Sequence, residues 1–285
     1  MSSPLQKLAN NHAGNDFVIG DLHGCIDLLE RLLLEVNFNK NTDRLFSVGD
    51  LIDRGPASLA CINLLTEPWF YAVQGNHENM MLAYFQENLI AGQLPYWDSL
   101  EDSDFFYNGG EWVKDYFQAD QQCMTAEFNH VLALARDLPT VIIVGEGNQR
   151  FHVIHAELTR PKRNTTSPQV WLDHDIDQWF INETVSADIE TRLLWSRTLM
   201  SREDDIQFNH KQQVGLSTTF CGHTFARKPR QVLSHVCIDT GAYLSINCDN
   251  LYGLTLFDIR NSQYLLTSYQ NKEVIKHDFP ISQSV

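Results

Sequence analysis

Short apolar runs alternate with amphipathic segments through the first half of the chain. Three of these runs, each of four or five residues, precede a glycine within two positions: 16–19, 44–48 and 69–73. Apolar residues recur at helical spacing over 28–36, 57–65 and 80–86. Strands that alternate with helices predict a parallel sheet, and the loops at the carboxyl ends of its strands form the ligand crevice.

The second half predicts a helix over 128–135 and a series of further strands. The expected strands cover 141–144, 151–154, 218–221, 235–238, 254–257 and 264–266. Residues 90–125 are irregular and rich in aromatic side chains, which indicates an insertion or a helical cap. Residues 157–185 are polar and contain Pro161 and Pro168, so we expect a long surface loop there.

No internal repeat, low-complexity tract or clear linker divides the chain of 285 residues. A typical length of about 150 residues per domain allows two domains, but one large α/β domain fits as well. We therefore expect a single domain over 16–270, with an N-terminal extension at 1–15 and a C-terminal tail at 271–285.

The charge balance is strongly acidic, because 21 lysine and arginine residues face 36 aspartate and glutamate residues, which gives a net charge of −15. A protein that binds the nucleic-acid backbone needs a basic face, so the composition argues against a nucleic-acid partner. The same charge repels phosphorylated substrates at long range. A phosphate-binding site in this chain would need local positive charge, which bound metal ions could supply.

Other features of the sequence indicate a cytoplasmic protein. No stretch approaches 18 uninterrupted apolar residues, so no membrane span is expected, and the first residues lack the apolar core of a signal peptide. The six cysteines are scattered and include no Cys-x-x-Cys pair. At this frequency we expect reduced and mostly buried thiols.

Polar side chains follow the glycines that end the first three predicted strands. Asp21 and His23 are two residues apart, so both side chains point to one side of an extended segment. Asp50 follows the second strand, and Asn76 follows the third. Oxygen and imidazole ligands without thiolates suit borderline-hard divalent metals such as Mn²⁺, Fe²⁺ or Zn²⁺.

Two histidines at later strand ends extend this set of candidate ligands. His155 follows the predicted strand at 151–154, and His223 follows the strand at 218–221. With the four residues above they make six ligands, about enough for two metal ions that share one bridging carboxylate. Any one of these residues alone would usually be part of a turn or a buried side chain, but the order and spacing of the loops favour a site.

The loop sequences and their spacing resemble a known family. The pattern consists of Asp21-x-His23, Gly49-Asp50-x-x-Asp53-Arg54-Gly55 and Gly75-Asn76-His77-Glu78. It resembles the calcineurin-like metallophosphoesterase superfamily, and within it the PPP-type serine/threonine protein phosphatases of the bacterial and phage lambda branch. Further strings similar to that branch are Asn108-Gly109-Gly110, Leu194-Trp195-Ser196-Arg197, Gly222-His223-Thr224 and Ile238-Asp239-Thr240-Gly241-Ala242.

The resemblance implies an α/β (α+β) fold, a two-sheet β-sandwich flanked by helices and built on a β-α-β-α-β motif. It also implies that two divalent metal ions are bound. The implied ligands of one metal are Asp21, His23 and Asp50, and those of the other are Asp50, Asn76, His155 and His223. Mn²⁺ is the expected metal, with Fe²⁺ and Zn²⁺ as alternatives that the same ligand types accept.

The same resemblance implies roles for four further residues. Arg54 and Arg197 would bind the substrate phosphate, for which a planar guanidinium is suited. His77 would be the general acid that protonates the leaving alkoxide, and Asp53 would orient its imidazole. A hydroxide that bridges the two metals would attack phosphorus directly. The implied partners are phosphorylated proteins or peptides.

Two alternative functions are open. A symmetrical dinucleoside tetraphosphatase of the same superfamily typically lacks an aspartate at the position of Asp53. A non-catalytic scaffold would keep the fold without the metals, although all six ligands and His77 are present. One departure from the family pattern is Glu157, where glycine or aspartate is more common. This residue is not a ligand in the family, so we expect only an indirect effect on the site.

Overall fold

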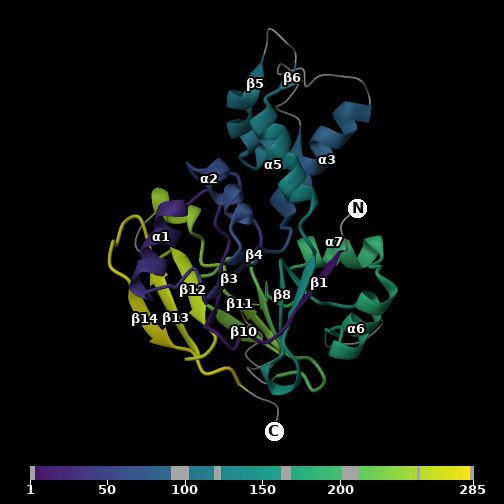
Figure 1. Ribbon diagram of the computed structural model, residues 1–285, viewed down its shortest axis with the longest axis vertical. Coiled ribbons are helices and arrows are strands. Elements are labelled where there is room, and N and C mark those ends of the chain that lie inside the picture. Colours follow the sequence, from purple (N-terminus) through teal and green to yellow (C-terminus); the bar gives the residue numbers. More distant parts are fainter. Residues whose placement is uncertain are drawn as a thin grey trace.

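The chain folds into a sandwich of two sheets with helices on its outer surfaces (Figure 1). The computed structural model describes residues 4–90, 103–118, 123–161, 168–200, 212–248 and 251–282. A helical cap rises from one end of the sandwich, and the C-terminal end of the chain lies at the other end. The predicted α/β sandwich of two sheets flanked by helices is therefore confirmed.

One sheet contains the three strands predicted first. From edge to edge it consists of β14 (Ile275–Asp278), β13 (Gln263–Thr267), β12 (Leu254–Asp258), β2 (Asp16–Ile19), β3 (Arg44–Ser47) and β4 (Phe70–Ala72). β2, β3 and β4 are parallel, as predicted, whereas β12 pairs with β2 in the antiparallel direction. The C-terminal strands thus complete the sheet beside the first strand of the β-α-β-α-β unit.

The other sheet is built mostly from the second half of the chain. Its order is β1 (Leu5–Leu8), β7 (Val141–Val144), β8 (Phe151–Ile154), β9 (Thr218–Cys221), β11 (His235–Cys237) and β10 (Arg230–Val232). β8 and β9 are parallel, so the residues that follow them emerge at the same end of the sheet. Strands β1 and β14 lie in the segments expected to flank the domain, and the division at 15 and 270 stays a prediction.

Apolar side chains fill the space between the sheets and also cover their outer faces. The inner layer includes Val18, Phe46, Ile142, Phe151, Phe220 and Phe257. On β2 the side chains alternate, because Val18 points into this layer while Phe17 and Ile19 pack with the helices on the other side. This arrangement explains why the strands are continuous apolar runs, which is typical of sheets covered on both faces.

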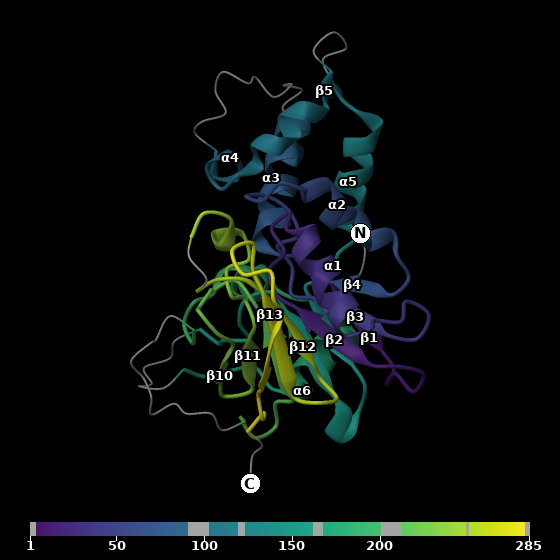
Figure 2. The ribbon, with the colours of Figure 1, turned by 90° about the vertical axis from the view of Figure 1, so that its left-hand side faces the viewer.

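Helices connect and cover the parallel strands (Figure 2). α1 (Ile26–Glu35) follows β2 and buries Leu28, Leu29 and Leu32, while α2 (Ser58–Asn63) continues into the 3-10 helix η1 (Leu64–Thr66) before β4. Two further 3-10 helices are η4 (Gly147–Gln149) and η6 (Tyr243–Ile246). None of the helices in the described ranges combines the length and the apolar character needed to cross a bilayer.

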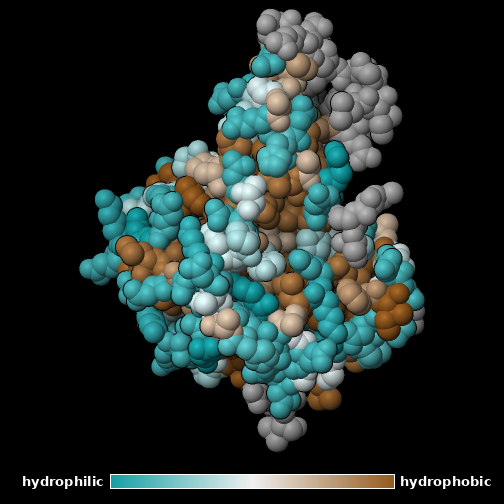
Figure 3. All heavy atoms as spheres, viewed as in Figure 1, coloured by the Kyte–Doolittle hydropathy of each residue, from teal (hydrophilic) through white to brown (hydrophobic). Residues whose placement is uncertain are grey.

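The cap is the part of the chain formed by residues 76–90, 103–118 and 123–136. It contains α3 (Asn76–Ile90), α4 (Asp104–Tyr107), η3 (Gly110–Tyr116), β5 (Phe117–Gln118), β6 (Cys123–Met124) and α5 (Ala126–Arg136). Aromatic rings pack in its interior, for example Phe85 against Phe105 and Phe128, and hydrophobic side chains are also visible over its helices in Figure 3. The predicted helical cap is present, although 91–102 and 119–122 lie outside the described residues.

The expected surface loop over 157–185 is wrong, because its second half forms helix α6 (Asp173–Asn182). Ile176 and Trp179, three residues apart, are buried and join the apolar cluster on the outer face of the second sheet. The Asp175 carboxylate accepts a hydrogen bond from the Leu172 N–H at 2.9 Å, which stabilises the first turn. The polar residues that favoured a loop lie on the exposed face of α6. The next helix is α7 (Ala187–Trp195).

Candidate metal centre

Three loops at the carboxyl ends of β2, β3 and β4 carry the first group of predicted ligands. Asp21 and His23 follow β2, Asp50 follows β3, and Asn76 is the first residue of α3 after β4. All four residues are buried. Because these strands are parallel neighbours, the loops meet at one edge of the sheet.

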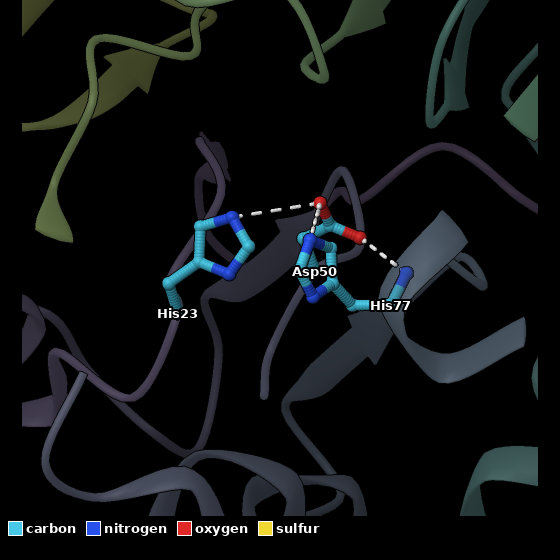
Figure 4. A group of neighbouring side chains, drawn as sticks. All are labelled: His23, Asp50 and His77. Atoms are coloured by element: carbon cyan, nitrogen blue, oxygen red, sulfur yellow. Dashed lines mark hydrogen bonds and ion pairs between the residues drawn. The ribbon is translucent and has the colours of Figure 1, made fainter. Parts of the chain in front are cut away.

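The second sheet brings its two histidines to the same place. His155 follows β8, and His223 lies two residues beyond β9. Two groups of side chains have ligand atoms within 4.8 Å of one another: His23, Asp50 and His77, and Asp50, His155 and His223. Asp50 belongs to both groups, and Figure 4 shows the imidazoles of His23 and His77 directed at the same oxygen of its carboxylate.

Backbone carbonyl groups orient two of the imidazoles. His23 Nδ1 lies 2.9 Å from the Ile52 carbonyl oxygen, and His155 Nδ1 lies 2.8 Å from that of Val48. A carbonyl oxygen only accepts, so each Nδ1 carries the proton and each Nε2 keeps its lone pair. Both Nε2 atoms lie 3.5 Å from the Asp50 carboxylate. This is the arrangement by which proteins hold histidine ligands of metal ions.

Asn76 and Asp21 complete the set of six predicted ligands. Asn76 Oδ1 lies 2.8 Å from His155 Nε2 and 2.9 Å from His223 Nδ1, so three ligand atoms converge at this point. The Asp21 carboxylate accepts the His223 backbone N–H at 3.1 Å and belongs to neither of the two groups above. The structure thus brings all six residues together, and it also places His77 within 3.9 Å of Asp50.

Buried carboxylates repel one another in this site. Burial, with repulsion from Asp239 and Asp50, raises the pKa of Asp21 well above its ordinary value. Burial also raises the pKa of Asp239 to about 6. Burial acts on Asp50 in the same direction, but the three neighbouring histidines hold its pKa below the ordinary range. Buried like charges are costly unless a cation lies between them, so this donor set fits divalent metal ions.

The ligand histidines favour the form that binds metals. Burial, reinforced by nearby cationic groups, lowers the pKa of His23 well below its ordinary value and lowers that of His155 as well. The same cause lowers the pKa of His223 to about 2. At neutral pH the three imidazoles are therefore uncharged, and a neutral imidazole offers a lone pair to a metal.

His77 differs from these histidines because a carboxylate holds its ring. Its Nδ1 donates a hydrogen bond to Asp53 Oδ2 at 2.6 Å, and its Nε2 lies 3.9 Å from Asp50 Oδ2. Burial would lower the pKa of His77, but Asp50 and Asp53 together raise it above its ordinary value. The ring can therefore carry a proton on Nε2 beside the ligand cluster.

The two predicted phosphate-binding arginines lie beside different ligands. The guanidinium of Arg54 is 3.3 Å from His23 Nε2 and lies 4.5 Å from the ring centre of Tyr243 in η6. Arg197 Nη1 donates to the His223 carbonyl oxygen at 2.9 Å and to Thr224 Oγ1 at 3.2 Å. One cation thus stands on the side of His23 and the other on the side of His223.

Glu78 had no role in the sequence reasoning, although it belongs to the third loop. Its buried carboxylate accepts four backbone N–H groups at distances of 3.1, 2.8, 3.3 and 2.9 Å, from Asp50, Leu51, Ile52 and Gly75. It therefore fastens the loop after β3 to the loop after β4. The signal in the sequence is a glutamate three residues after the glycine that follows a predicted strand.

Glu157 holds a second loop in place, on the side of the site where Arg197 lies. Its carboxylate accepts the backbone N–H groups of Thr198, Leu199 and Met200 at 2.8, 2.9 and 2.9 Å, and the Ser196 hydroxyl at 2.8 Å. These contacts fix the turn that carries Arg197. The carboxylate that departs from the family pattern thus holds a turn that lies next to His223.

Several site residues have backbone conformations that are unusual for side chains other than glycine. Positive φ angles of 42°, 51°, 71°, 67° and 68° occur at His23, Asp50, Asp53, Arg54 and His223. Such conformations cost of order 1–3 kcal/mol each and persist where the surrounding structure holds them. Strain is therefore concentrated in the loops that bear the candidate functional groups.

Comparison with known proteins agrees with this geometry. The sequence profile described as "Calcineurin-like phosphoesterase" matches residues 17–228, which include the three loops, both later histidines and both arginines. The chain belongs to this family. As a member it is a phosphoesterase, a hydrolase of a family that uses a binuclear metal centre, and the two ligand groups provide candidate residues for such a centre.

Two relatives and one solved structure show the range of the family around this chain. "Serine/threonine-protein phosphatase 2" of Salmonella typhimurium is 31% identical over 232 residues, which cover 81% of this chain and 89% of that protein. "Bis(5'-nucleosyl)-tetraphosphatase, symmetrical" of Legionella pneumophila is 30% identical over 179 residues, or 55% of this chain and 59% of that protein. A protein serine/threonine phosphatase from Saccharomyces cerevisiae shares the fold, with a TM-score of 0.52 at 15% identity, covering 98% of this chain and 85% of the other.

Proposed function

We propose that this phosphoesterase is a metal-dependent phosphoprotein phosphatase that acts on phosphoserine and phosphothreonine. In this proposal Asp21, His23 and Asp50 hold one metal ion, and Asp50, Asn76, His155 and His223 hold the other. When bound, divalent ions such as Mn²⁺ would offset the charge of the phosphate and lower the pKa of a water molecule at the site. We further propose phosphorylated proteins as partners in the cytoplasm.

Arg54 and Arg197 would bind the phosphate from two sides. Each guanidinium already lies within 3.3 Å of an atom of a ligand histidine, so both are within reach of a phosphate that contacts the metals. A guanidinium forms paired hydrogen bonds to phosphate oxygens, which gives orientation as well as charge. These two residues supply the local positive charge that a chain of net charge −15 needs.

The pairing of His77 with Asp53 is the observation that carries the proposal. Asp53 accepts the Nδ1 proton at 2.6 Å, so the acidic proton of His77 is on Nε2, beside Asp50. An oxygen atom from water forms a new bond to phosphorus. As the phosphorus–oxygen bond of the ester breaks, its electron pair stays on the leaving oxygen and the Nε2 proton of the cationic ring moves to that oxygen. His77 is thereby left neutral and still donates from Nδ1 to Asp53. A positioned acid contributes about 10²–10⁴-fold when the leaving group is an alkoxide.

A symmetrical dinucleoside tetraphosphatase is the second candidate function. The relative of that name from Legionella pneumophila supports it, although the alignment covers 55% of this chain. Cleavage of such a substrate releases a nucleoside diphosphate, a stable anion that leaves without a proton. A general acid formed by His77 and Asp53 therefore accelerates phosphoserine hydrolysis more than dinucleotide hydrolysis, which is why we favour the first function.

A substrate panel on Mn²⁺-loaded protein tests this choice. We expect phosphoserine and phosphothreonine peptides to be hydrolysed with a higher kcat/KM than phosphotyrosine peptides, cyclic nucleotides and diadenosine tetraphosphate. The opposite order, with diadenosine tetraphosphate preferred, would replace the first function by the second.

A variant of His77 tests the mechanism on the same protein. His77→Asn should lower kcat for a phosphoserine peptide by about 10²–10⁴-fold, because the alkoxide leaves without its proton. For p-nitrophenyl phosphate the loss should be much smaller, because that leaving group departs as a stable anion. Elemental analysis should find both metals still bound. Equal losses on the two substrates, or a lost metal, would show that His77 is a ligand instead of an acid.

A further inference from the structure

Among the described residues, the Asp53 carboxylate has two side-chain partners, one on each oxygen. Oδ2 accepts from His77 Nδ1 at 2.6 Å, and Oδ1 accepts from the indole N–H of Trp112 at 2.7 Å. The Asp53 side chain has no exposed surface, so no solvent molecule reaches it from outside the protein. Its own backbone N–H donates to Ser58 Oγ at 2.9 Å. Trp112 is thus the second of the two side chains that hold this carboxylate.

Trp112 belongs to the cap, 59 residues away from Asp53 along the chain. Its ring packs against those of Tyr116 and Phe128, with ring centres 5.8 and 5.9 Å away, and these two rings also lie 6.1 Å from each other. The backbone just before it touches the loop after β3, since a Cβ atom added to Gly109 would lie 2.8 Å from the Arg54 nitrogen. The cap therefore fixes both the indole and its distance from Asp53.

The indole is suited to hold a carboxylate in one orientation. It has a single N–H donor and no acceptor, so its hydrogen bond to Oδ1 has only one direction. Without that bond the Asp53 carboxylate could rotate about its Cβ–Cγ bond, and Oδ2 would no longer be held against His77 Nδ1. A buried charge that loses one of two hydrogen bonds is also costly to keep ionised. Burial raises the pKa of Asp53, and the contacts with His77 and Trp112 act against that rise.

We propose that Trp112 is a positioning residue for the reaction: through Asp53 it aligns the imidazole of His77 for proton transfer to an alkoxide leaving group. The acid of this enzyme then consists of three side chains. Asp53 comes from the loop after β3, His77 from the cap helix α3, and Trp112 from the 3-10 helix η3 of the cap. The inference rests on the proposed function, because it requires that His77 acts as an acid.

Trp112→Phe removes the N–H group and keeps an aromatic ring against Tyr116 and Phe128. The measurements are kcat and KM for a phosphoserine peptide and for p-nitrophenyl phosphate, with Mn²⁺-loaded protein, and metal content by elemental analysis. We expect kcat for the peptide to fall about tenfold, which corresponds to about 1.4 kcal/mol, with KM and metal content unchanged. For p-nitrophenyl phosphate we expect a loss below about twofold, because its leaving group needs no proton.

Phe128→Leu is the matched control. It disturbs the packing of the same indole and leaves the N–H group of Trp112 in place. A purely structural role of Trp112 would make Trp112→Phe resemble this control, with equal losses on both substrates. The ratio of the two kcat values is independent of the fraction of folded protein, because both substrates are measured on one preparation.

Combination with His77→Asn separates the inference from the function on which it rests. If Trp112 acts through His77, Trp112→Phe should cause no further loss on the peptide once His77→Asn is present. A selective loss in His77→Asn without one in Trp112→Phe would overturn the inference alone. An unselective loss in His77→Asn would overturn the proposed acid, and with it both proposals.

Discussion

Gly75 lies directly before Asn76 in the loop after β4 and faces the Asp50 loop so closely that the structure leaves no room for a side chain. A Cβ atom at this position would lie 2.2 Å from Asp50 Oδ1, 2.3 Å from the Asp50 backbone nitrogen and 2.8 Å from Glu78 Oε2. The φ angle of Gly75 lies outside the left-handed region, so alanine would meet a steric obstacle and no conformational one. Gly75→Ala is thus a test of how closely the loops must approach each other.

The required displacement follows from these distances. Ordinary contact begins at 3.4 Å, so a contact of 2.2 Å calls for a shift of about 1.2 Å in the Asp50 loop, the Asn76 loop or both. A misplacement of about 1 Å can cost about 10²-fold in rate. Because Asp50 belongs to both ligand groups, both metal sites should be disturbed at once. Forcing an extra methyl group into a packed interior costs about 1–3 kcal/mol of stability.

We therefore expect Gly75→Ala to lower kcat/KM for p-nitrophenyl phosphate by at least about 10²-fold and to reduce the metal content of the purified protein. The assay combines steady-state kinetics, elemental analysis and urea denaturation. Gly147→Ala is the matched control, because nothing lies within 4 Å of its added Cβ, although its φ angle is +58°. That control should lose some stability and keep both metals and activity. A Gly75→Ala protein with full metal content and wild-type kinetics would refute the argument.

Three further predictions concern the metals, the buried histidines and the thiols. A chelator should abolish phosphatase activity and Mn²⁺ should restore it, with Asp50→Asn the most damaging ligand change; activity in metal-free protein would contradict the site. Burial lowers the pKa of His152 and His235 to about 3, so their neutral forms stabilise the fold above pH 6.5 and this stability is lost as the pH falls toward 3. At pH 5 the free energy of unfolding is lower by about 2 kcal/mol per histidine. Between pH 8 and pH 5 the urea midpoint of His235→Gln should therefore fall less than that of the wild type. All six cysteines are free in the structure, and thiol titration after denaturation without reductant should find six; one native disulfide would argue against a cytoplasmic location.

Much of the site could be predicted because its residues follow strand ends in short, recognisable strings. Asp21, Asp50 and Asn76 come within three residues of the end of apolar runs, and parallel pairing of neighbouring strands brings such positions together without further information. His155 and His223 obey the same rule in the second sheet. Asp239, two residues beyond β11, obeys it too, and strand-end reasoning could have added it to the list.

What could not be predicted depends on contacts between distant segments. The bond from Trp112 to Asp53 joins the cap to a loop 59 residues earlier, and nothing in the local sequence of 103–118 indicates it. Helix α6 was not predicted because most of its residues are polar. Its two buried apolar residues, Ile176 and Trp179, form a recognisable face only through their packing against the second sheet. The need for glycine at position 75 also depends on a contact between distant segments, because the Asp50 loop approaches this position too closely for a side chain.

The order of strands in the first sheet has a consequence for how the enzyme is assembled. β2 lies between β3, which is made shortly after it, and β12, which is made more than 230 residues later. β9 and His223 also come from the last third of the chain. Contacts between such distant segments are slow to form, and a growing chain reaches them only near the end of its synthesis. In a ribosome-bound chain that stops short of β12, the strand before Asp21 and His23 lacks one of its two neighbours. We therefore expect the protein to bind its metals only after the finished chain is released.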